Sequence, residues 1–386
     1  MQKKYLVVGA GFSGAVLANQ LAQYSDCTID IWDERDHVAG NCHTSRDAET
    51  GVMVHRYGPH IFNTDKKEIW DFVNGFVEFH PFINRVKACY QGNIYSLPVN
   101  LHTINQFFGK TFGPAEAKAF IETQGDSSIA EPGSFEEQAL KFIGKDLYKA
   151  FFYGYTKKQW GCEPSELPAS ILKRLPVRFN YNDNYYNNIY QGIPVNGYSE
   201  LVEKLVDHES ITVTLNKKFV YSEELANTYD HIFYTGPIDG FFNYRSGRLA
   251  YRTVTFEQHI ETGDHQGNAV INYCDKEVPY TRVHEHKHFA PWESHDKTVY
   301  FKEFSKETGI DDVPYYPKRL EGDKSLLLKY RADAEALSGV SFLGRLATYR
   351  YMDMHHVIGE ALEYARDFLV ATGKGEKPSV FPNTES

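Results

Sequence analysis

A glycine-rich hexapeptide near the N-terminus constrains this chain more than any other feature of its sequence. Residues 9–14 read Gly-Ala-Gly-Phe-Ser-Gly and directly follow the short apolar run of residues 5–8. Small and apolar side chains at positions 15, 16, 18, 21 and 22 then fit one face of a helix. A second apolar run, residues 28–32, ends at Asp33. The order predicts a strand, a tight turn, a helix and a second strand that is followed by an acid.

This order is typical of a dinucleotide-binding unit. Gly9 permits the sharp turn, Gly11 lets a pyrophosphate approach the backbone, and Gly14 lets the helix lie close to its strand. The unpaired N–H groups at the helix N-terminus would bind the diphosphate. Asp33, about 20 positions after Gly14, would accept hydrogen bonds from the adenosine ribose. A carboxylate favours a 2′-hydroxyl over a 2′-phosphate, so NAD and FAD both stay open, and a chance glycine turn is the alternative.

Length and charge limit the other classes of protein. A chain of 386 residues exceeds the ~250–300 residues of a single core, so we expect two or three domains. The net charge of −10 argues against an extended basic surface that would bind nucleic acid or anionic lipid. No apolar run approaches the ~20 residues of a membrane span, and we expect no signal peptide. Five cysteines without a CxxC motif predict reduced thiols and a cytoplasmic location. Aromatic residues reach 15%, which suits stacking on flat ligands as well as core packing.

The rest of the chain predicts an interleaved α/β fold. Helical signals dominate residues 103–160, including a capping pattern that starts at Ser134, while residues 178–190 look like a loop. Four β-rich segments, residues 253–256, 269–273, 280–289 and 298–304, predict an antiparallel sheet. A strand at 340–343 and a long helix after it suggest that the C-terminus returns to the nucleotide-binding sheet. Such interleaving is more typical of FAD-binding proteins than of simple NAD dehydrogenases.

We therefore expect a discontinuous FAD-binding Rossmann-like domain with a helical insert and an antiparallel β-sheet domain. The expected divisions are 1–80, 196–250 and 325–386 for the Rossmann-like domain; 100–178 for a mainly helical domain with a mobile substrate loop; and 81–99, 179–195 and 251–324 for the antiparallel sheet and substrate-binding region.

Longer strings in the sequence are more specific than the glycine pattern. They resemble bacterial UDP-galactopyranose mutases over nearly the whole chain. The matching strings are residues 9–14, 35–37, 40–41, 57–62, 96–100, 154–161, 167–179, 272–273, 278–282, 314–317, 344–346 and 348–354.

The resemblance implies an enzyme that interconverts UDP-galactopyranose and UDP-galactofuranose with reduced, non-covalently bound FAD. In the family scheme, N5 of the reduced flavin attacks the anomeric carbon, UDP leaves, and a flavin-iminium adduct allows the ring to contract. The resemblance also implies a homodimer and a role in supplying galactofuranose for cell-surface polysaccharides. No nucleic acid or membrane partner is expected.

The resemblance also assigns residues to roles. Arg174 and Arg282 resemble the pair that neutralises the UDP diphosphate, although a solvated surface charge is the usual role of an isolated arginine. The other implied catalytic residues are His60, Tyr316, Tyr351 and Asp353. The implied cofactor-binding residues are Gly9, Gly11, Phe12, Ser13, Gly14, Asp33, Glu34, Arg35, Asn41, His60, Ile61, Gly236, Arg345, Asp353 and Met354. The implied substrate-binding residues are Asn84, Phe151, Phe152, Tyr155, Thr156, Trp160, Arg174, Tyr185, Arg252, Asn272, Arg282, Tyr316 and Tyr351.

Two positions depart from the family pattern. Asn63 stands where the family string His-Ile-Phe-His ends in histidine, so an amide that cannot titrate replaces an imidazole. Ala39 stands where the family usually has a glycine, a small change if φ is negative there.

Three histidines in alternation, His284, His286 and His288, would share one face of a strand. With no acid or cysteine at ligand spacing on that face, they predict no metal site.

Three other functions stay open. The same mechanism could act on another UDP-hexose, such as UDP-N-acetylgalactopyranose, because one acetamido group needs only local pocket volume. The FAD domain could instead serve a conventional oxidoreductase of amines or alcohols. A UDP-sugar-binding protein without turnover is the third alternative, suggested by Asn63.

Overall fold

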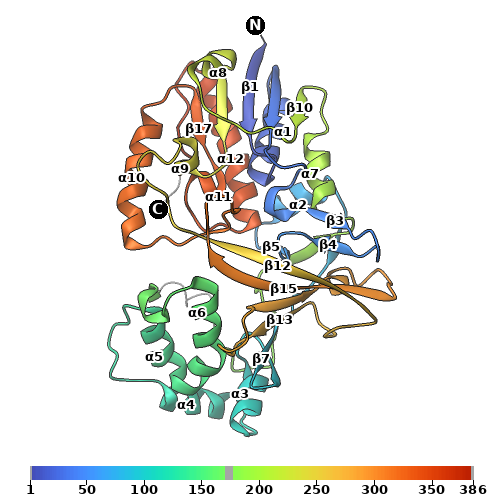
Figure 1. The fold of residues 1–386 in the computed structure, drawn as a ribbon, viewed down its shortest axis with the longest axis vertical. Coiled ribbons are helices and arrows are strands. Elements are labelled where there is room, and N and C mark those ends of the chain that lie inside the picture. Colours follow the sequence, from blue (N-terminus) through green and yellow to red (C-terminus); the bar gives the residue numbers. More distant parts are fainter. Residues whose placement is uncertain (1, 170–176, 384–386) are drawn as a thin grey trace.

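A five-stranded parallel sheet forms the upper layer of the molecule (Figure 1), in a computed structural model that describes residues 2–169 and 177–383. The strand order is β10-β2-β1-β11-β17, and every neighbouring pair is parallel. The strands are β1 (Lys3–Val8), β2 (Cys27–Trp32), β10 (Ile211–Thr214), β11 (His231–Tyr234) and β17 (Val340–Phe342). The predicted return of the C-terminal part of the chain to this sheet is therefore confirmed.

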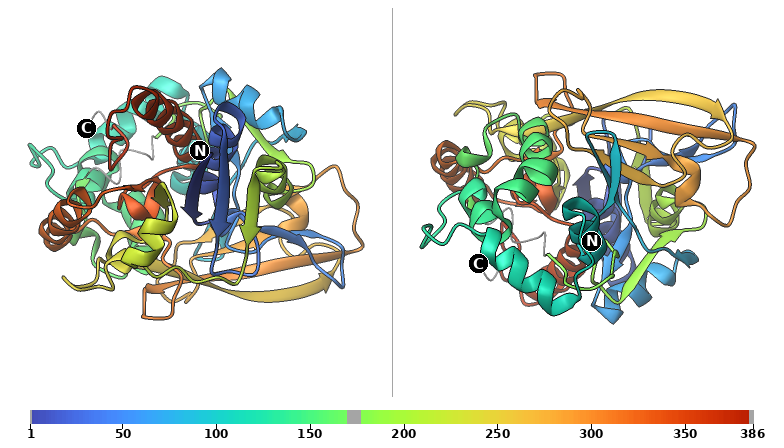
Figure 2. Two further views of the ribbon diagram at one scale, coloured as in Figure 1. Left: turned by 90° about the horizontal axis from the view of Figure 1, so that it is seen from above. Right: turned by 90° about the horizontal axis from the view of Figure 1, so that it is seen from below.

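Helices cover both faces of the parallel sheet. On one face, Leu17 and Leu21 of α1 (Phe12–Tyr24) pack with Phe368 of α12 (Met354–Gly373). The left view of Figure 2, from above, shows α12 in dark red beside the blue N-terminal elements. On the other face, Phe241 of α9 (Ile238–Phe241) packs with Tyr330 of α10 (Glu321–Glu335). Apolar side chains lie on both sides of the central strands β1 and β11, which explains the continuous hydrophobic runs at residues 5–8 and 232–234.

A second sheet of seven strands crosses the middle of the molecule (Figure 1), in the order β16-β12-β15-β14-β13-β7-β8. The four β-rich segments of the sequence pair antiparallel as predicted, and one further pair, β13 with β7, is parallel. The strands are β7 (Lys87–Tyr90), β8 (Asn93–Ser96), β12 (Tyr251–Thr262), β13 (Val270–Tyr273), β14 (Arg282–Glu285), β15 (Lys297–Glu307) and β16 (Tyr316–Pro317).

The strand predicted over residues 280–289 is shorter than expected. β14 pairs with β15 only as far as Glu285, and His286–Phe289 forms a 3-10 helix. His286 and His288 therefore do not continue the alternation from His284, and the expected common face of the three histidines does not exist. The backbone turns where Ala290 N–H donates to the carbonyl of Lys287, which removes the strand periodicity.

The predicted helical insert is present at the lower end of the molecule (Figure 1). Ser134 Oγ accepts from the N–H of Glu137, as its capping pattern predicted, but the Glu137 carboxylate accepts from Gly133 instead of closing the box on Ser134. The helices are α3 (Leu101–Phe108), α4 (Pro114–Gln124), α5 (Phe135–Leu147), a π-helix (Tyr148–Tyr153), α6 (Gly154–Trp160) and a 3-10 helix (Pro164–Glu166).

Shorter elements connect these layers. A three-stranded sheet has the order β5-β9-β6, and β3 pairs with β4. Across the described residues, no helix combines the length and the apolar character that a membrane crossing requires. The remaining elements are the 3-10 helix Gly40–Cys42, β3 (Thr44–Arg46), β4 (Met53–His55), β5 (Phe62–Thr64), α2 (Lys67–Asn74), β6 (Phe79–Pro81), β9 (Tyr190–Pro194), α7 (Tyr198–Val206), α8 (Glu223–Thr228) and α11 (Gly344–Ala347).

Candidate functional site

One cavity joins the parallel sheet, the second sheet and the helical insert. It has a volume of about 2230 Å³, whereas a site for one small ligand usually takes roughly 300–1,000 Å³. Its wall includes Val8 and Trp32 at the carboxyl ends of parallel strands, Arg282 from β14, and Tyr155 and Trp160 from α6. The carboxyl ends of parallel strands are where α/β sheets bind ligands. The cavity has room for a dinucleotide and a second ligand together.

The glycine turn has the shape that the sequence predicted. Gly9 has a φ of +108°, and a Cβ there would lie 2.1 Å from Thr235 Oγ1. A Cβ on Gly14 would lie 2.0 Å from the carbonyl oxygen of Gly9, so helix and turn are in contact. At Gly11, by contrast, the nearest described atom to an added Cβ would be Gly40 Cα, at 4.0 Å. Gly11 therefore leaves open backbone at the start of α1, while Gly9 and Gly14 permit close packing.

Asp33 is bound to the backbone of this turn. Its Oδ2 accepts from the N–H of Ala10 at 2.8 Å, and its Oδ1 accepts from the N–H of Arg35 at 2.9 Å. The carboxylate thus fixes the turn that precedes α1. Asp33 and Glu34 both line the cavity, and contact with a ribose stays a prediction for each.

Beside the turn, Arg35 offers a donor to the cavity. Its Nη2 donates to Asn41 Oδ1 at 2.8 Å, and its guanidinium lies 4.7 Å from the ring centroid of Tyr57. Its Nη1 is buried and has no hydrogen-bond partner among the residues that the structure describes. Because buried guanidinium donors are almost always paired, this atom indicates a polar ligand group.

His60 also lines this wall, and its imidazole is neutral. Burial lowers its pKa to about 4, although a bond to the carbonyl of Gly58 opposes the shift. The Nδ1–H donates to that carbonyl at 2.8 Å, which leaves Nε2 as an acceptor. The positive charges of Arg345 and Arg282 lower the pKa further.

Arg282 is held in the cavity wall by a buried carboxylate. Its Nε lies 2.8 Å from Oε1 of Glu303, a residue that is 1% exposed. The two residues are register partners in β14 and β15. Thr281 Oγ1 donates to the same oxygen at 3.0 Å, and the attraction to Glu303 raises the pKa of Arg282 against the opposing effect of burial. The Arg282 guanidinium therefore stays charged. Its Nε is held by Glu303, and its two Nη groups can donate to a ligand.

Two tyrosines and Arg345 form a second part of the wall. The rings of Tyr316 and Tyr351 stack with centroids 5.9 Å apart, and the Arg345 guanidinium lies 5.7 and 5.2 Å from them. Arg345 Nε donates to the carbonyl of Met352 at 3.1 Å. Burial raises the pKa of Tyr316 to about 12, so its phenol stays a hydrogen-bond donor at neutral pH.

The aromatic wall on α6 faces Arg282. Tyr155 and Trp160 both line the cavity, and the Arg282 charge acts on the Tyr155 phenol, whose pKa burial raises. These two rings present the flat faces that a nucleotide base or a sugar ring requires.

Two buried amides also indicate a ligand. Asn84 is 4% exposed and Asn272 is 8% exposed, and in the described part of the chain the Oδ1 atom of neither has a hydrogen-bond partner. Both residues line the cavity. Buried acceptors normally receive a hydrogen bond, so we expect a ligand or a water molecule to donate one to each of these oxygens.

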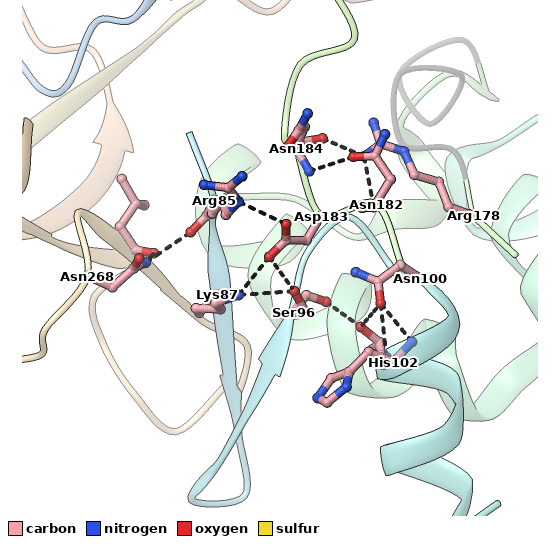
Figure 3. Close-up of polar contacts among 12 residues, drawn as sticks. Arg85, Lys87, Ser96, Asn100, His102, Arg178, Asn182, Asp183, Asn184 and Asn268 are labelled. Carbon is pink, nitrogen blue, oxygen red and sulfur yellow. Dashed lines mark hydrogen bonds and ion pairs between the residues drawn. The ribbon is translucent and has the colours of Figure 1, made fainter. Parts of the chain in front are cut away.

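The segment that carries Tyr185 is tied to the second sheet by a cluster of polar contacts (Figure 3). The Asp183 carboxylate accepts from Arg85 Nε and from Lys87 Nζ, each at 3.1 Å. The N–H of Tyr185 then donates to the carbonyl of Asn84 at 2.8 Å. Tyr185 and Asn84 are therefore brought to the cavity together, from positions about a hundred residues apart.

The structure brings most of the predicted site residues together. They line the one cavity from both sheets and α6: Gly9, Gly11, Phe12, Ser13, Asp33, Glu34, Arg35, Asn41, His60, Ile61, Asn84, Tyr155, Trp160, Tyr185, Gly236, Asn272, Arg282, Tyr316, Arg345, Tyr351, Asp353 and Met354.

Other predicted residues lie behind the wall. Phe151 and Phe152 belong to the core of the helical insert, and Thr156 is 5% exposed. Arg252 is buried behind α6, where its Nε donates to the carbonyl of Gln159 at 3.0 Å. Their direct contact with substrate stays a prediction, as does the role of Gly14. Arg174 lies outside the described residues, and so does most of the expected substrate loop.

Ala39 has a φ of +72°, so the condition under which its exchange for glycine would be small is not met. Alanine in this left-handed region is strained where glycine is not.

Two groups of described side chains bring three possible metal ligands within 4.8 Å of one another. In the first, Asp264, Glu285 and His288, the Lys287 ammonium lies 2.7 Å from Asp264 and already supplies a cation. The second, Asp353, His355 and His356, lines the cavity at the first turn of α12. We assign no ion to either group, and the predicted absence of a metal stays a prediction.

Sequence reasoning missed the residues that support the site. Glu303 gave no motif, and only the register of β14 and β15 places it opposite Arg282. At the far end of the cavity, Lys217 Nζ lies 3.5 Å from the ring centroid of Trp32. Trp32 was visible as the last residue before Asp33, but nothing in the sequence connected Lys217 to it.

Comparisons with known proteins agree on one family. A family model described as UDP-galactopyranose mutase matches residues 150–351, and one described as NAD(P)-binding Rossmann-like domain matches residues 7–76. A Klebsiella pneumoniae protein named "Probable UDP-galactopyranose mutase" is 55% identical over 379 residues, which cover 98% of each chain. An Escherichia coli dTDP-fucopyranose mutase is 52% identical and covers 95% of this chain and 98% of its own.

Solved structures share the fold. The crystal structure of a reduced UDP-galactopyranose mutase superimposes with a TM-score of 0.76 at 14% identity and covers 99% of each chain. A putrescine oxidase bound to putrescine has a TM-score of 0.58 at 10% identity, covering 96% of this chain and 99% of its own. At these identities the likeness concerns the fold alone.

Proposed function

Because the chain belongs to the UDP-galactopyranose mutase family of flavin-dependent isomerases, we propose that it interconverts UDP-galactopyranose and UDP-galactofuranose in this cavity. The observation that carries the proposal is the position of Arg282 in the cavity wall. Its guanidinium stays charged against buried Glu303 in the wall of a cavity that also contains the glycine turn. A nucleotide diphosphate is the ligand that such a guanidinium binds well.

The residues at the glycine turn fit an FAD molecule. The first turn of α1 has no acidic residue and no side-chain cap, so its N–H groups are available to a diphosphate. The open backbone at Gly11 and the unpartnered Nη1 of Arg35 lie on the same side of the cavity wall. We propose that FAD binds there non-covalently and that the reduced form is the active one.

The chemistry supplied by a bound, reduced flavin is nucleophilic displacement of UDP from the anomeric carbon of the sugar. Arg282 would neutralise the diphosphate both in the bound substrate and in the departing nucleotide. Tyr316 and Tyr351 would donate phenolic hydrogen bonds to phosphate or sugar oxygens, and Tyr155 and Trp160 would stack against the base or the sugar ring. Arg174 would supply the second guanidinium.

His60 would keep its proton at Nδ1 and accept a hydrogen bond at Nε2. With a pKa of about 4, it stays neutral through the physiological range. A neutral imidazole beside the cofactor can accept a hydrogen bond but does not add a positive charge. Asp353 would hold polar groups of the sugar or flavin at the start of α12.

The proposal is tested with purified protein reduced by dithionite. We expect conversion of UDP-galactofuranose to UDP-galactopyranose, and a covalent flavin–hexose product after trapping with cyanoborohydride. The visible spectrum before and after reduction, with and without UDP, checks cofactor and nucleotide binding separately. Flavin-loaded, reduced protein that shows no turnover would defeat the proposal, and rapid bleaching by an amine or alcohol would favour an oxidoreductase.

A second substrate class is favoured by the E. coli relative, whose name specifies a dTDP-linked deoxyhexose. The same cavity chemistry would serve dTDP-fucose, UDP-galactose or UDP-N-acetylgalactosamine, because diphosphate and pyranose ring are common to all three. The ratio of kcat/KM values for these substrates decides among them. A preference for the dTDP-sugar would keep the mechanism and change the nucleotide specificity.

We also propose that the protein is a cytoplasmic homodimer whose product feeds cell-surface polysaccharide synthesis. The support is the resemblance of the sequence, together with five free cysteines in the chain. Mass measurement in solution checks the dimer, and cell fractionation checks the location.

A further inference from the structure

The ammonium of Lys158 is surrounded by main-chain oxygens. Lys158 lies on α6, and its Nζ donates to the carbonyls of Tyr273, Asp275, Val278 and Tyr280 at 2.7, 2.9, 2.9 and 3.0 Å. An ammonium has three N–H donors, so four acceptors more than satisfy it. Among the described residues, no carboxylate lies within ion-pair distance of this nitrogen, and the carbonyls alone solvate the charge.

These four carbonyls belong to the connection between β13 and β14. Tyr273 follows Asn272, and Tyr280 precedes Arg282 by two positions; Asn272 and Arg282 are register partners and both line the cavity. The four carbonyls around Lys158 therefore lie in the stretch of chain that joins Asn272 to Arg282.

The helix that carries Lys158 supplies the aromatic wall. Tyr155 lies three residues before Lys158, and Trp160 lies two residues after it. The first residue of α6, Gly154, contacts the same connection, because a Cβ there would lie 2.2 Å from the carbonyl of Cys274. Gly154 and Lys158 are one helical turn apart, so one face of α6 meets the connection twice.

The opposite side of α6 is also held. Arg252 donates to the carbonyls of Lys158 and Gln159 at 3.3 and 3.0 Å, and Ser305 Oγ donates to Gln159 at 2.7 Å. This clamp fixes the C-terminal carbonyls of α6 to β12 and β15. Lys158 is the charged contact that joins the helix to the β13–β14 connection.

We propose that Lys158 is a positioning residue, whose ammonium sets the distance between the aromatic wall on α6 and the polar pair Asn272 and Arg282. We further infer that the four carbonyls form a site for a small monovalent cation, which Lys158 fills in the native chain. Carbonyl oxygens can replace the hydration shell of K⁺ in proteins. This inference rests on the proposed function for the identity of the ligand that spans wall and arginine.

The test compares Lys158→Met and Lys158→Ala with Lys157→Met, in flavin-loaded protein. Lys157 is the matched control, since it pairs with Glu163 at the surface. We expect both Lys158 variants to bind UDP on the order of tenfold more weakly, about 1.4 kcal/mol, and to raise KM more than they lower kcat. Lys157→Met should bind UDP as the wild type does.

Cation rescue separates positioning from bulk stability. In Lys158→Ala, added KCl should restore most of the UDP affinity, whereas choline chloride at equal ionic strength should not, because the larger cation does not fit among the carbonyls. Lys158→Met, whose side chain fills the space, should not respond to K⁺.

Wild-type affinity for UDP in Lys158→Met would overturn the proposal, as would equal rescue by K⁺ and choline. Failure of both Lys158 variants to fold, with Lys157→Met intact, would also overturn it, because Lys158 would then serve the fold alone. The wild-type protein is measured first, so a failure of the proposed function appears as absent UDP binding or turnover before any variant is made.

Discussion

The two ends of the cavity are built in different ways. At the end that contains the glycine turn, the turn, the start of one helix, Asp33 and Arg35 all come from a single segment of about 30 residues. At the other end, Tyr155, Arg282, Tyr316 and Tyr351 come from four separate segments, and side chains make the surface. The close packing at the first end depends on the absence of Cβ atoms at Gly9 and Gly14, whereas the second end depends on buried charges that hold its side chains in place.

The contacts that hold the two ends of the cavity in place differ in the same way. The glycine turn is closed by backbone contacts and by the bonds of Asp33 to Ala10 and Arg35. At the other end, Glu303 binds the Arg282 guanidinium. Hydrogen bonds of Lys158 and Arg252 to main-chain carbonyls hold α6. Buried ion pairs add little net stability but are costly to break. The two ends should therefore respond differently to substitution.

The largest effect is expected from Gly14→Ala. The new Cβ would lie 2.0 Å from the carbonyl oxygen of Gly9, so α1 must move away from the turn. We expect loss of bound flavin, measured by absorbance near 450 nm, and destabilisation of about 1–3 kcal/mol. Gly373→Ala is the matched control, because a Cβ there meets no atom of the described residues within 4 Å. Normal flavin content in Gly14→Ala would show that the turn tolerates side chains.

Arg282→Met should separate the two ends of the cavity. We expect kcat/KM to fall about 10²–10³-fold with flavin still bound, because the diphosphate loses a charged donor. The variant should also lose about 3 kcal/mol of stability, since buried Glu303 is left without its partner.

Adding Glu303→Gln to Arg282→Met sharpens this prediction. The double variant should regain stability in urea unfolding without regaining activity. Recovery of activity would remove Arg282 from the mechanism.

Acid should weaken the parallel sheet through His231. Burial lowers the pKa of this residue to about 4, and its Nε2 lies 2.8 Å from Ser341 Oγ. As the pH falls below about 6.5, the unfolded chain takes up a proton that the folded chain does not, so stability is lost between about pH 6.5 and pH 4. We expect His231→Phe to remove about 1–2 kcal/mol of the loss between pH 7 and pH 5, measured by urea unfolding.

His102→Gln, at an exposed position, is the control for this pH dependence. An unchanged pH slope in His231→Phe would mean that His231 titrates normally in the folded protein.

The smallest effect is expected from Asn63→His, which restores the residue usual in the family. Asn63 lines the cavity, and its Nδ2 donates to the carbonyl of Ile61 at 3.1 Å, a bond that an imidazole N–H can also make. We expect kcat to change by less than about threefold, or roughly 0.6 kcal/mol. A large gain would instead support the alternative that the native chain binds nucleotide sugar without efficient turnover.

Local patterns predicted the first end well. Residues 9–14 specified the turn because Gly9 and Gly14 admit no Cβ, a requirement that the sequence displays directly. The same patterns predicted the return of the strand at residues 340–343 and the helical insert. They failed for residues 286–289, where alternation suggested a strand but the pairing of β14 stops at Glu285.

The second end was found only through the resemblance of long strings to a known family. Tyr155, Arg282 and Tyr351 carry no periodicity that marks them, and each alone would be assigned to a core or surface role. Their supports are even less visible, because Glu303 and Lys158 are ordinary charged residues in the sequence. What distinguishes them is burial, which depends on contacts between distant segments.

The sequence by itself determined the glycine turn, its helix and the family, because glycine spacing and matched strings are local properties of the chain. Tertiary structure decided which charges are buried and paired. The register of β14 against β15 put Glu303 beside Arg282, and the connection between β13 and β14 put four carbonyls around Lys158. Electrostatic interactions across such distances in sequence exist only once the chain has folded, since burial removes the water that would otherwise screen each charge.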